Sequence, residues 1–573
     1  MIFRVIFLFP LLFFSSLSAH SSYKLSLDEI SPSLKKEFTE YSSLIKFQEI
    51  PLKTNSQLEW RAQDDLELLK RLYQEEGHLS PDLKLGILYD DTPPTIEIKG
   101  SSGPLYLLKA VEVNDGIQTY QLQGDEIGQT ATIERILHLE DELIKRLKKK
   151  GYPFAELDNR SILASKEEAS VTVILEVNIG PKATFANVSI KGNKSVETEL
   201  IRQKITWDPG DSYSAQAVDE TASALEATGL FTQVIVKPLS TEYNEVPMMI
   251  EVSEAKHRTI GAGVGFTSQL GAGVNLEWEH RNFRRIGETL NIRTSLWNRL
   301  QSASILYLKP DVFLEGQNLI SKAEVFREVT DGFTELSWGV SSLLERQFSE
   351  TAQISYGLAF KQLHNTRSDN DRLFTLVKTP FKLYYNKTDD LMDPSMGCTA
   401  WLKLTPTLQI LSPQFAYCIS QLNLTQYVPL NDNCILAGKL SFGSIWGSSR
   451  RGIPPSERFY AGTESLLRGY RYMTVSPLNE KHKPIGGRSL LIGSLEIRKK
   501  ITDTIGLVGF YEAGNVYDTS APNFKEKILQ SAGGGVRYHT PVGPLRCDVG
   551  FPLNPRKHVD KGYEIYFSIG QSF

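Results

Sequence analysis

The 573-residue sequence has little of what marks an enzyme or a metalloprotein. Its four cysteines form no C-x-x-C pair, which leaves zinc and redox motifs without support; they are Cys398, Cys418, Cys434 and Cys547. It also lacks an H-E-x-x-H motif and any Ser/His/Asp constellation that could form a catalytic site. We therefore expect no catalytic, metal-binding or cofactor-binding site, and a protein that is not an enzyme.

The sequence also lacks a strong charge of either sign. The formal net charge is −4, so no large basic surface predicts a nucleic-acid partner. Apolar residues make up 41% of the chain and charged residues 23%. This balance is too polar for a bundle of membrane helices and too apolar for a disordered protein.

Long hydrophobic runs are missing after the first residues. Arg4 precedes the apolar run 5–14, and small residues follow to Ala19, which is the pattern of an export signal over residues 1–19. The run is shorter than the ~20 residues that a membrane-spanning helix needs. An exported chain of this kind is either soluble outside the cytoplasm or enters a membrane as a β-barrel.

Residues 22–256 repeat one pattern of a helix, a glycine that ends it and an alternating strand. The glycines are Gly77, Gly151 and Gly229, at intervals of 74 and 78 residues, and each suits a left-handed helix C-cap. The preceding helices are expected at 66–73, 143–150 and 217–228, each with one apolar stripe. The repeats predict three β-α-α-β-β domains over residues 22–105, 106–181 and 182–256.

After Lys256 the helical period gives way to alternation of apolar and polar residues. Val274, Leu276 and Trp278 alternate with polar residues, as in strands with one apolar face. A soluble sandwich would alternate too, but the remaining residues, at roughly 20 per strand and connection, give ~16 strands. This even number favours a transmembrane β-barrel over residues 257–573, because closure removes exposed sheet edges.

Several C-terminal motifs carry a family resemblance. They are Arg468-Gly469-Tyr470, then Phe510, Glu512 and Gly514, a glycine run at 533–535, and a final strand that ends on Phe573. This set resembles the BamA/TamA superfamily of outer-membrane assembly barrels, and repeat 182–256 looks like a POTRA domain. Three such domains favour the TamA-like branch, since BamA-like relatives usually carry five and two-partner secretion transporters two.

The resemblance implies where the motifs act. The loop with Arg468, Gly469 and Tyr470 would fold into the barrel, and its arginine would dock on an inner wall that carries Phe510, Glu512 and Gly514. Glu512 stands where the family more often has aspartate, and Asp389, Pro394 and Gly397 resemble a further strand signature. Reversing the charges of Arg468 and Glu512 together should restore some function only if the two touch.

A lateral gate is implied between the first and last strands. Its residues are expected to be Gly261, Gly263, Gly265, Phe567, Gly570 and Phe573. Because glycine weakens a strand interior, this seam is predicted to be the weakest in the barrel.

The resemblance further implies partners and a location. Unfolded outer-membrane protein clients would bind POTRA domains in the periplasm, the barrel would lie in the lipid bilayer of the outer membrane, and an inner-membrane-anchored, TamB-like partner would assist. The alternatives are a BamA-like general insertase, a passive porin or surface antigen, and a barrel enzyme. A porin would have no POTRA repeats and no loop folded around an arginine.

Overall fold

A computed structural model describes most of the chain, in two compact units. The described residues are 23–27, 32–48, 50, 54–91, 93–116, 118–240, 244–267, 269–366, 371–540 and 543–569. One unit comprises residues 1–191, 205–224 and 235–251, and the other 192–204, 225–234 and 252–573. The predicted signal peptide lies outside the described residues. Within the described part, helices of the length and apolar character needed to cross a bilayer are absent.

Three small α+β domains occupy the chain before Lys256. The first contains β1 (Lys24–Leu27), α1 (Pro32–Tyr41), α2 (Ser43–Lys46), α3 (Asn55–Glu75), β2 (Asp82–Leu88) and β3 (Thr95–Ser101). The second contains β4 (Leu107–Asn114), β5 (Thr119–Gln121), α4 (Ile133–Lys149), β6 (Glu156–Ser165) and β7 (Ser170–Asn178). The third contains β8 (Thr184–Lys191), α5 (Thr198–Gln203), α6 (Ala215–Glu226), β9 (Phe231–Pro238) and β10 (Glu245–Glu254).

The three sheets share a three-stranded core of the same topology, to which the second adds β5. Their strand orders are β1-β3-β2, β5-β4-β7-β6 and β8-β10-β9, and in each the first long strand runs parallel to the last. The glycines that end α3, α4 and α6 adopt φ values of 98°, 103° and 65°, the left-handed conformation that glycine favours.

The expected β-α-α-β-β order is found in the third domain but is wrong for the second. There β5 replaces the first helix, because the chain reverses after β4 at Asp115 and Gly116. Gly116 has a φ of 81° and its N–H donates to the Asn114 side chain at 3.0 Å, so an Asp-Gly turn sends the chain back as a hairpin. The first domain contains a third helix, α2.

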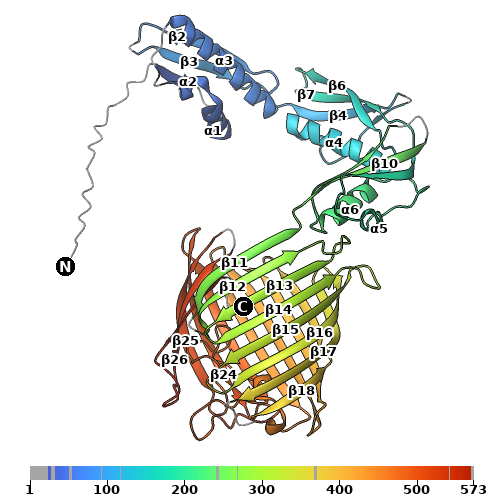
Figure 1. Cartoon of the computed structure of the whole chain (residues 1–573). Helices are drawn as coiled ribbons and strands as arrows, with labels where there is room; N and C mark the ends of the chain where they lie inside the picture. The colour runs from blue at the N-terminus through green and yellow to red at the C-terminus, as the bar shows by residue number, and fades with distance from the viewer. Residues whose placement is uncertain are drawn as a thin grey trace, which may run out of the picture. The chain divides into compact units, whose positions relative to one another are not determined.

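A single antiparallel sheet follows, with its strands in chain order. The strands are β11 (Arg258–Thr267), β12 (Gly271–His280), β13 (Thr289–Trp297), β14 (Leu300–Lys309), β15 (Gln317–Val329), β16 (Thr334–Ser349), β17 (Ala352–Thr366), β18 (Arg372–Lys378), β19 (Phe381–Thr388), β20 (Gly397–Gln409), β21 (Phe415–Asn431), β22 (Cys434–Trp446), β23 (Ser489–Lys500), β24 (Ile505–Tyr517), β25 (Leu529–Tyr538), β26 (Leu545–Pro552) and β27 (Glu564–Ile569). Figure 1 shows β11 to β18 side by side as tilted arrows.

Two of these 17 strands form one crossing of the barrel. Both β18 and β19 pair with β17 on one side and β20 on the other. The break between them falls at Pro380, which has no N–H to donate to a ladder. The sheet therefore makes 16 crossings, and the expectation of a barrel of about 16 antiparallel strands is confirmed.

The two faces of the barrel wall differ in polarity. On β16, Leu336 and Trp338 face outward and are 60% and 46% exposed, while Glu335 and Ser337 on the other face are buried. An apolar outer face and a polar lumen are what a lipid-embedded barrel requires.

At the C-terminal end of β10, Glu254 holds the loop between β8 and α5. Its carboxylate accepts hydrogen bonds from the N–H groups of Lys194, Ser195 and Val196 at 2.6, 2.8 and 2.9 Å, and from the Ser195 hydroxyl. Burial alone would raise the pKa of Glu254, but these hydrogen bonds outweigh it and lower the pKa to about 2.

We predict that Glu254→Gln loosens this loop in a pH-dependent way. The folded pKa lies below the ordinary glutamate value of about 4.3, so the stabilisation is complete above about pH 5 and is lost as the pH falls toward 2. At pH 7 the variant should lower hydrogen-exchange protection of the amides of residues 194–196 by roughly tenfold or more.

The difference between wild type and variant should disappear between pH 4 and 2. Glu251→Gln is the matched control, because Glu251 lies on the same strand but is exposed beside Lys237. Equal protection in wild type and Glu254→Gln at pH 7 would contradict the assignment.

Candidate functional site

The connection between β22 and β23 is folded onto the inner wall of the barrel. It spans residues 447–488 and contains only two short 3-10 helices, η1 (Arg450–Gly452) and η2 (Pro455–Glu457). Leu467, Tyr470 and Val475 are fully buried in it and pack with Ile492 of β23 and Val516 of β24. A long loop whose apolar residues are buried in this way is part of the packed structure of the barrel.

Arg468 lies at the centre of this contact. Its guanidinium is within 2.8–2.9 Å of Glu512 Oε1 on β24, 2.9 Å of Asp548 Oδ2 on β26 and 3.0 Å of Glu496 Oε2 on β23. The Arg468 N–H also donates to Glu512 Oε2 at 2.6 Å. One fully buried arginine therefore joins the loop to three strands by charge-assisted hydrogen bonds.

Other cations balance the three carboxylates. Arg498 Nε lies 2.7 Å from Glu496 Oε1, and Arg537 Nη1 lies 2.5 Å from Asp548 Oδ1. We call the buried side chains of this group the arginine cluster; they are Arg468, Arg498, Arg537, Arg546, Glu496, Glu512 and Asp548. Buried charges are stable only when they are paired. Each side chain of the cluster is therefore held in position by its oppositely charged neighbours.

An aromatic ring and two glycines complete the surroundings of the Arg468 side chain. The guanidinium carbon lies 3.5 Å from the centroid of the Phe510 ring, a cation–π contact. A Cβ on Gly533 would come within 2.4 Å of that ring, and a Cβ on Gly535 within 1.9 Å of Asp548 Oδ1. The glycine run on β25 therefore leaves room for Phe510 and Asp548.

Gly469 brings the loop backbone against the backbone of β26. Its φ is 95°, and a Cβ there would lie 3.0 Å from backbone atoms of Gly550 and Phe551. The Gly469 N–H donates to the Tyr566 hydroxyl on β27 at 2.8 Å. The loop thus reaches the last strand of the barrel directly.

Tyr470 closes the other side of the turn. Its hydroxyl lies 2.8 Å from the Gln530 carbonyl and 2.7 Å from Asn554 Oδ1, and its side chain is fully buried. The structure therefore brings Arg468, Gly469 and Tyr470 into contact with strands β24 to β27.

The remaining dock residue is Gly514 on β24. A Cβ there would lie 2.2 Å from the Leu491 carbonyl oxygen and 2.6 Å from Ile492 Cα, so Gly514 allows β23 and β24 to approach closely. Of these three dock residues, Phe510 and Glu512 are the ones that contact Arg468 in the described part of the chain.

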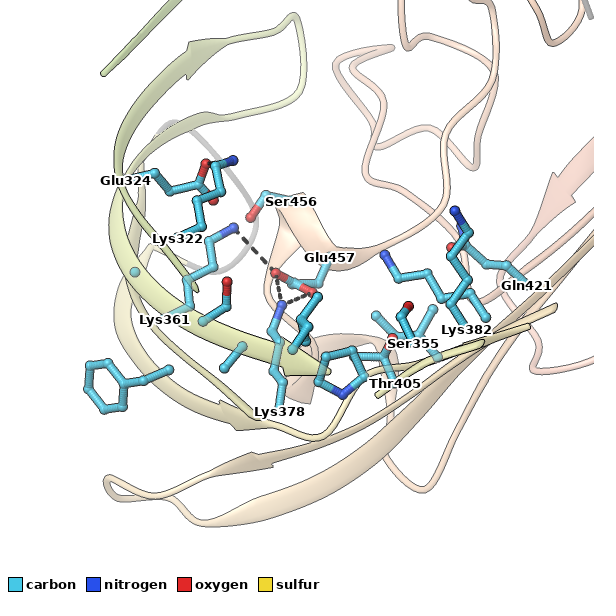
Figure 2. Close-up of a pocket in the computed structure, with 18 of the residues that line it drawn as sticks. Lys322, Glu324, Ser355, Lys361, Lys378, Lys382, Thr405, Gln421, Ser456 and Glu457 are labelled. Atoms are coloured by element: carbon cyan, nitrogen blue, oxygen red, sulfur yellow. Dashed lines mark hydrogen bonds and ion pairs between the residues drawn. The ribbon is translucent and has the colours of Figure 1, made fainter. Parts of the chain in front are cut away.

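Two further anchors of the loop were missed by the sequence analysis. Lys378 on β18 lies 2.6 and 2.7 Å from the two carboxylate oxygens of Glu457, and Lys361 on β17 lies 3.4 Å from one of them, as the dashed lines in Figure 2 show. On the far side of the turn, Arg471 binds Asp331 at 2.6 Å. The sequence offered one indication of these anchors, which was the position of Lys361 and Lys378 on the luminal face of their strands.

The gate residues predicted on β11 lie on an edge of the sheet. Gly261, Gly263 and Gly265 pair with β12 on one side, and Val264 between them is 85% exposed. Phe567 on β27 points outward and is 51% exposed. Gly570 and Phe573 lie outside the described residues.

The seam between β11 and β27 differs from the other strand contacts. The sheet order begins with β11 and ends with β27, and within the described ranges no ladder of paired residues joins the two. They nevertheless approach within 8 Å between Cα atoms. The structure thus has two adjacent edge strands where the barrel closes.

Asp389, from the further strand signature, organises the turn between β19 and β20. Its carboxylate accepts from the N–H groups of Ser395 and Met396 at 2.9 and 3.1 Å. Gly397, with a φ of 100°, lies against the Lys387 carbonyl, where a Cβ would come within 1.8 Å. Asp389 and Gly397 shape this turn, which is remote in sequence from the arginine cluster but contacts it, because Arg498 Nη1 lies 3.5 Å from the Pro394 carbonyl oxygen.

The fold and the site together define a class of protein: an outer-membrane β-barrel with an arginine-anchored internal loop and preceding α+β domains. The Omp85 superfamily domain matches residues 282–573, just over half of the chain, and the POTRA family, described as a surface antigen variable number repeat, matches residues 183–255. The chain belongs to the Omp85 superfamily, and its barrel lies in the outer membrane with POTRA domains in the periplasm.

Two proteins that are similar in sequence to this chain are outer membrane protein assembly factors. The chain is 23% identical over 483 residues to the outer membrane protein assembly factor BamA of Nitratidesulfovibrio vulgaris, covering 82% of this chain and 60% of that protein. It is 20% identical over 596 residues to BamA of Neisseria meningitidis, covering 91% and 74%. The chain thus spans less than two thirds of the first relative.

A solved structure supports the fold. The structure of BamA from Haemophilus ducreyi lacking POTRA domains 1–3 superposes with a TM-score of 0.69 at 19% identity, covering 76% of this chain and 94% of that one.

We predict that Arg468→Ala releases the loop while the barrel stays folded. Without the Arg468 guanidinium, the negative charges of the three buried carboxylates are no longer fully paired. Removal of one partner of a buried ion pair destabilises a protein by about 3–5 kcal/mol. Cleavage of residues 447–488 by proteinase K in membranes should therefore accelerate at least roughly tenfold. Lys481→Ala, an exposed position in the same loop, is the matched control.

Loop cleavage at the wild-type rate in Arg468→Ala would contradict this role. The structure also revises the charge-swap expectation. A glutamate at position 468 would face Glu496 and Asp548 as well as the introduced arginine, so Arg468→Glu with Glu512→Arg should not restore protection.

Proposed function

We propose that this protein is an outer-membrane assembly or translocation factor that receives unfolded β-rich clients on its periplasmic domains. It passes them into the membrane through a lateral gate between β11 and β27. The observation that carries the proposal is the seam itself, where two adjacent edge strands form no ladder within the described ranges.

Edge strands provide the chemistry of client binding. A strand with unpaired N–H and C=O groups accepts another chain by strand addition, with affinity from backbone hydrogen bonds and little dependence on client sequence. The glycines on β11 favour opening of the seam between β11 and β27, because glycine has no side chain that could pack in a strand interior. A client strand would add at β11 after β27 separates.

The periplasmic domains offer similar edges. The middle-domain strand β6 ends its sheet, and Leu163 on it is 57% exposed. Strand addition at such edges would hold a client in extended form before it reaches the barrel.

The internal loop would support the gate from inside. Tyr566 of β27 accepts a hydrogen bond from Gly469 and donates one to the Tyr470 carbonyl at 3.4 Å. The last strand is thus held by the loop on its luminal face, so the docked loop would position one side of the gate.

Two roles within this class remain as alternatives for the test. A TamA-like role, with an inner-membrane-anchored TamB-like partner, follows from the resemblance, while a BamA-like general insertase is favoured by the names of the curated relatives. Co-purification of a long, β-rich, membrane-anchored protein with this chain would support the first role. Insertion of varied clients in its absence would support the second.

Locking the seam tests the gate. The four native cysteines are first replaced by serine, and one cysteine is then placed at Gly261, Gly263 or Gly265 and one at Phe567 or Ser568. Pairs that crosslink on oxidation should abolish insertion of an unfolded barrel client into proteoliposomes, and reduction should restore it.

The matched control locks a seam that has a full ladder. Val274→Cys with Leu296→Cys joins β12 to β13 at paired positions and should leave insertion unchanged. Insertion at the unlocked rate by a fully crosslinked β11–β27 variant would exclude the lateral route.

A further inference from the structure

A cavity of about 850 Å³ opens on the luminal side of the wall, between the strands β15 to β21 and the internal loop. Figure 2 shows its side chains, with Glu457 and Ser456 entering from the loop and lysines from the wall. The cationic and anionic side chains that line it are Lys322, Lys361, Lys378, Lys382, Lys403, Arg458, Glu324 and Glu457. A volume of this size matches a small-molecule site.

The lysines are not all used to hold the loop. Glu457 binds Lys378 and Lys361, and Lys322 pairs with Glu324. Lys382 and Lys403 form no ion pair with a carboxylate in the described part of the chain; Lys382 lies 5.2 Å from the centroid of the Tyr384 ring. The cavity therefore has an excess of positive charge on the side of β19 and β20.

Lys382 and Lys403 also face each other directly. They are register partners in the ladder between β19 and β20, and both line the cavity. Like charges at directly opposed positions destabilise a sheet. A local arrangement that opposes stability without compensation is typical of a functional site.

Neutral hydrogen-bonding groups complete this side of the cavity. Ser355 pairs with Lys382 across the ladder between β17 and β19, and Gln421 pairs with Lys403 across the ladder between β20 and β21. The four side chains thus form one row across four strands, with two ammonium groups flanked by a hydroxyl and an amide.

We propose that this row is a binding site for a phosphate-bearing anion in the barrel lumen. A phosphate group carries up to two charges on oxygens that can contact two neighbouring ammonium groups at once, and lysine binds phosphate as a point charge. Ser355 and Gln421 would donate further hydrogen bonds to it. This inference rests on the cavity and does not depend on the lateral gate.

The test uses the full chain in dodecyl maltoside micelles, with tripolyphosphate as the probe in isothermal titration. Wild type should bind saturably, and affinity should fall as salt rises from 50 to 200 mM. Lys382→Gln and Lys403→Gln should each weaken binding by roughly tenfold. Tripolyphosphate should also raise the melting temperature of wild type but not of the double variant.

Lys387→Gln is the matched control, since Lys387 lies on β19 an odd number of residues from Lys382 and therefore on the opposite face; it should bind like wild type. Micelles containing phosphatidic acid form a second arm. If phosphatidic acid binds more tightly than tripolyphosphate, and this binding needs Lys382 and Lys403, the source of the phosphate is a lipid headgroup. If tripolyphosphate binds more tightly, the source is a soluble anion.

Absence of saturable phosphate binding in both arms would overturn the proposal. So would binding that survives unchanged in the double variant, or lysine-dependent binding of an acidic peptide alone.

Discussion

The structure of the barrel interior depends on one buried arginine. Arg468 is fully enclosed and meets carboxylates from β23, β24 and β26 at 2.8–3.0 Å. A charge removed from water in this way is tolerated only with close, well-oriented partners. The loop, the three strands and the glycines that leave space between them are therefore interdependent, and none of these parts can shift far without leaving a charge unpaired.

This constraint extends from the loop to the closing edge of the barrel. The residue after Arg468 donates to Tyr566 on β27, the strand that lies beside β11 at the seam. On the opposite wall, Glu457 holds the same loop to Lys378 and Lys361. The loop thus bridges the lumen from one side of the wall to the seam, so its docking and the position of β27 belong to one physical system.

Much of the architecture was predictable because it is encoded locally. Period-two alternation after Lys256 predicted the barrel, and the length of that segment predicted its strand number. Glycine-terminated helices located the elements of the α+β repeats. The turn of Arg468, Gly469 and Tyr470 was recognisable as a motif. What failed was also local: the Asp115-Gly116 turn makes a hairpin where a helix was expected.

The partners of Arg468 could not be fully predicted, because they come from strands far apart in sequence. Glu496 and Asp548 resemble many other acidic residues on luminal strand faces, and nothing in the sequence gives the register that aligns them with Glu512. The same holds for Lys382 and Lys403, which become neighbours only when β19 and β20 pair. Long-range register, rather than residue type, defines both sites.

The central claim, that the loop is held in the lumen by the Arg468 contacts, is tested most directly by hydrogen exchange of the Arg468 and Gly469 amides in the membrane-embedded protein. Both donate to buried acceptors, Glu512 and Tyr566, so we expect exchange as slow as that of amides in the neighbouring strands. Exchange at the rate of an exposed loop would contradict it.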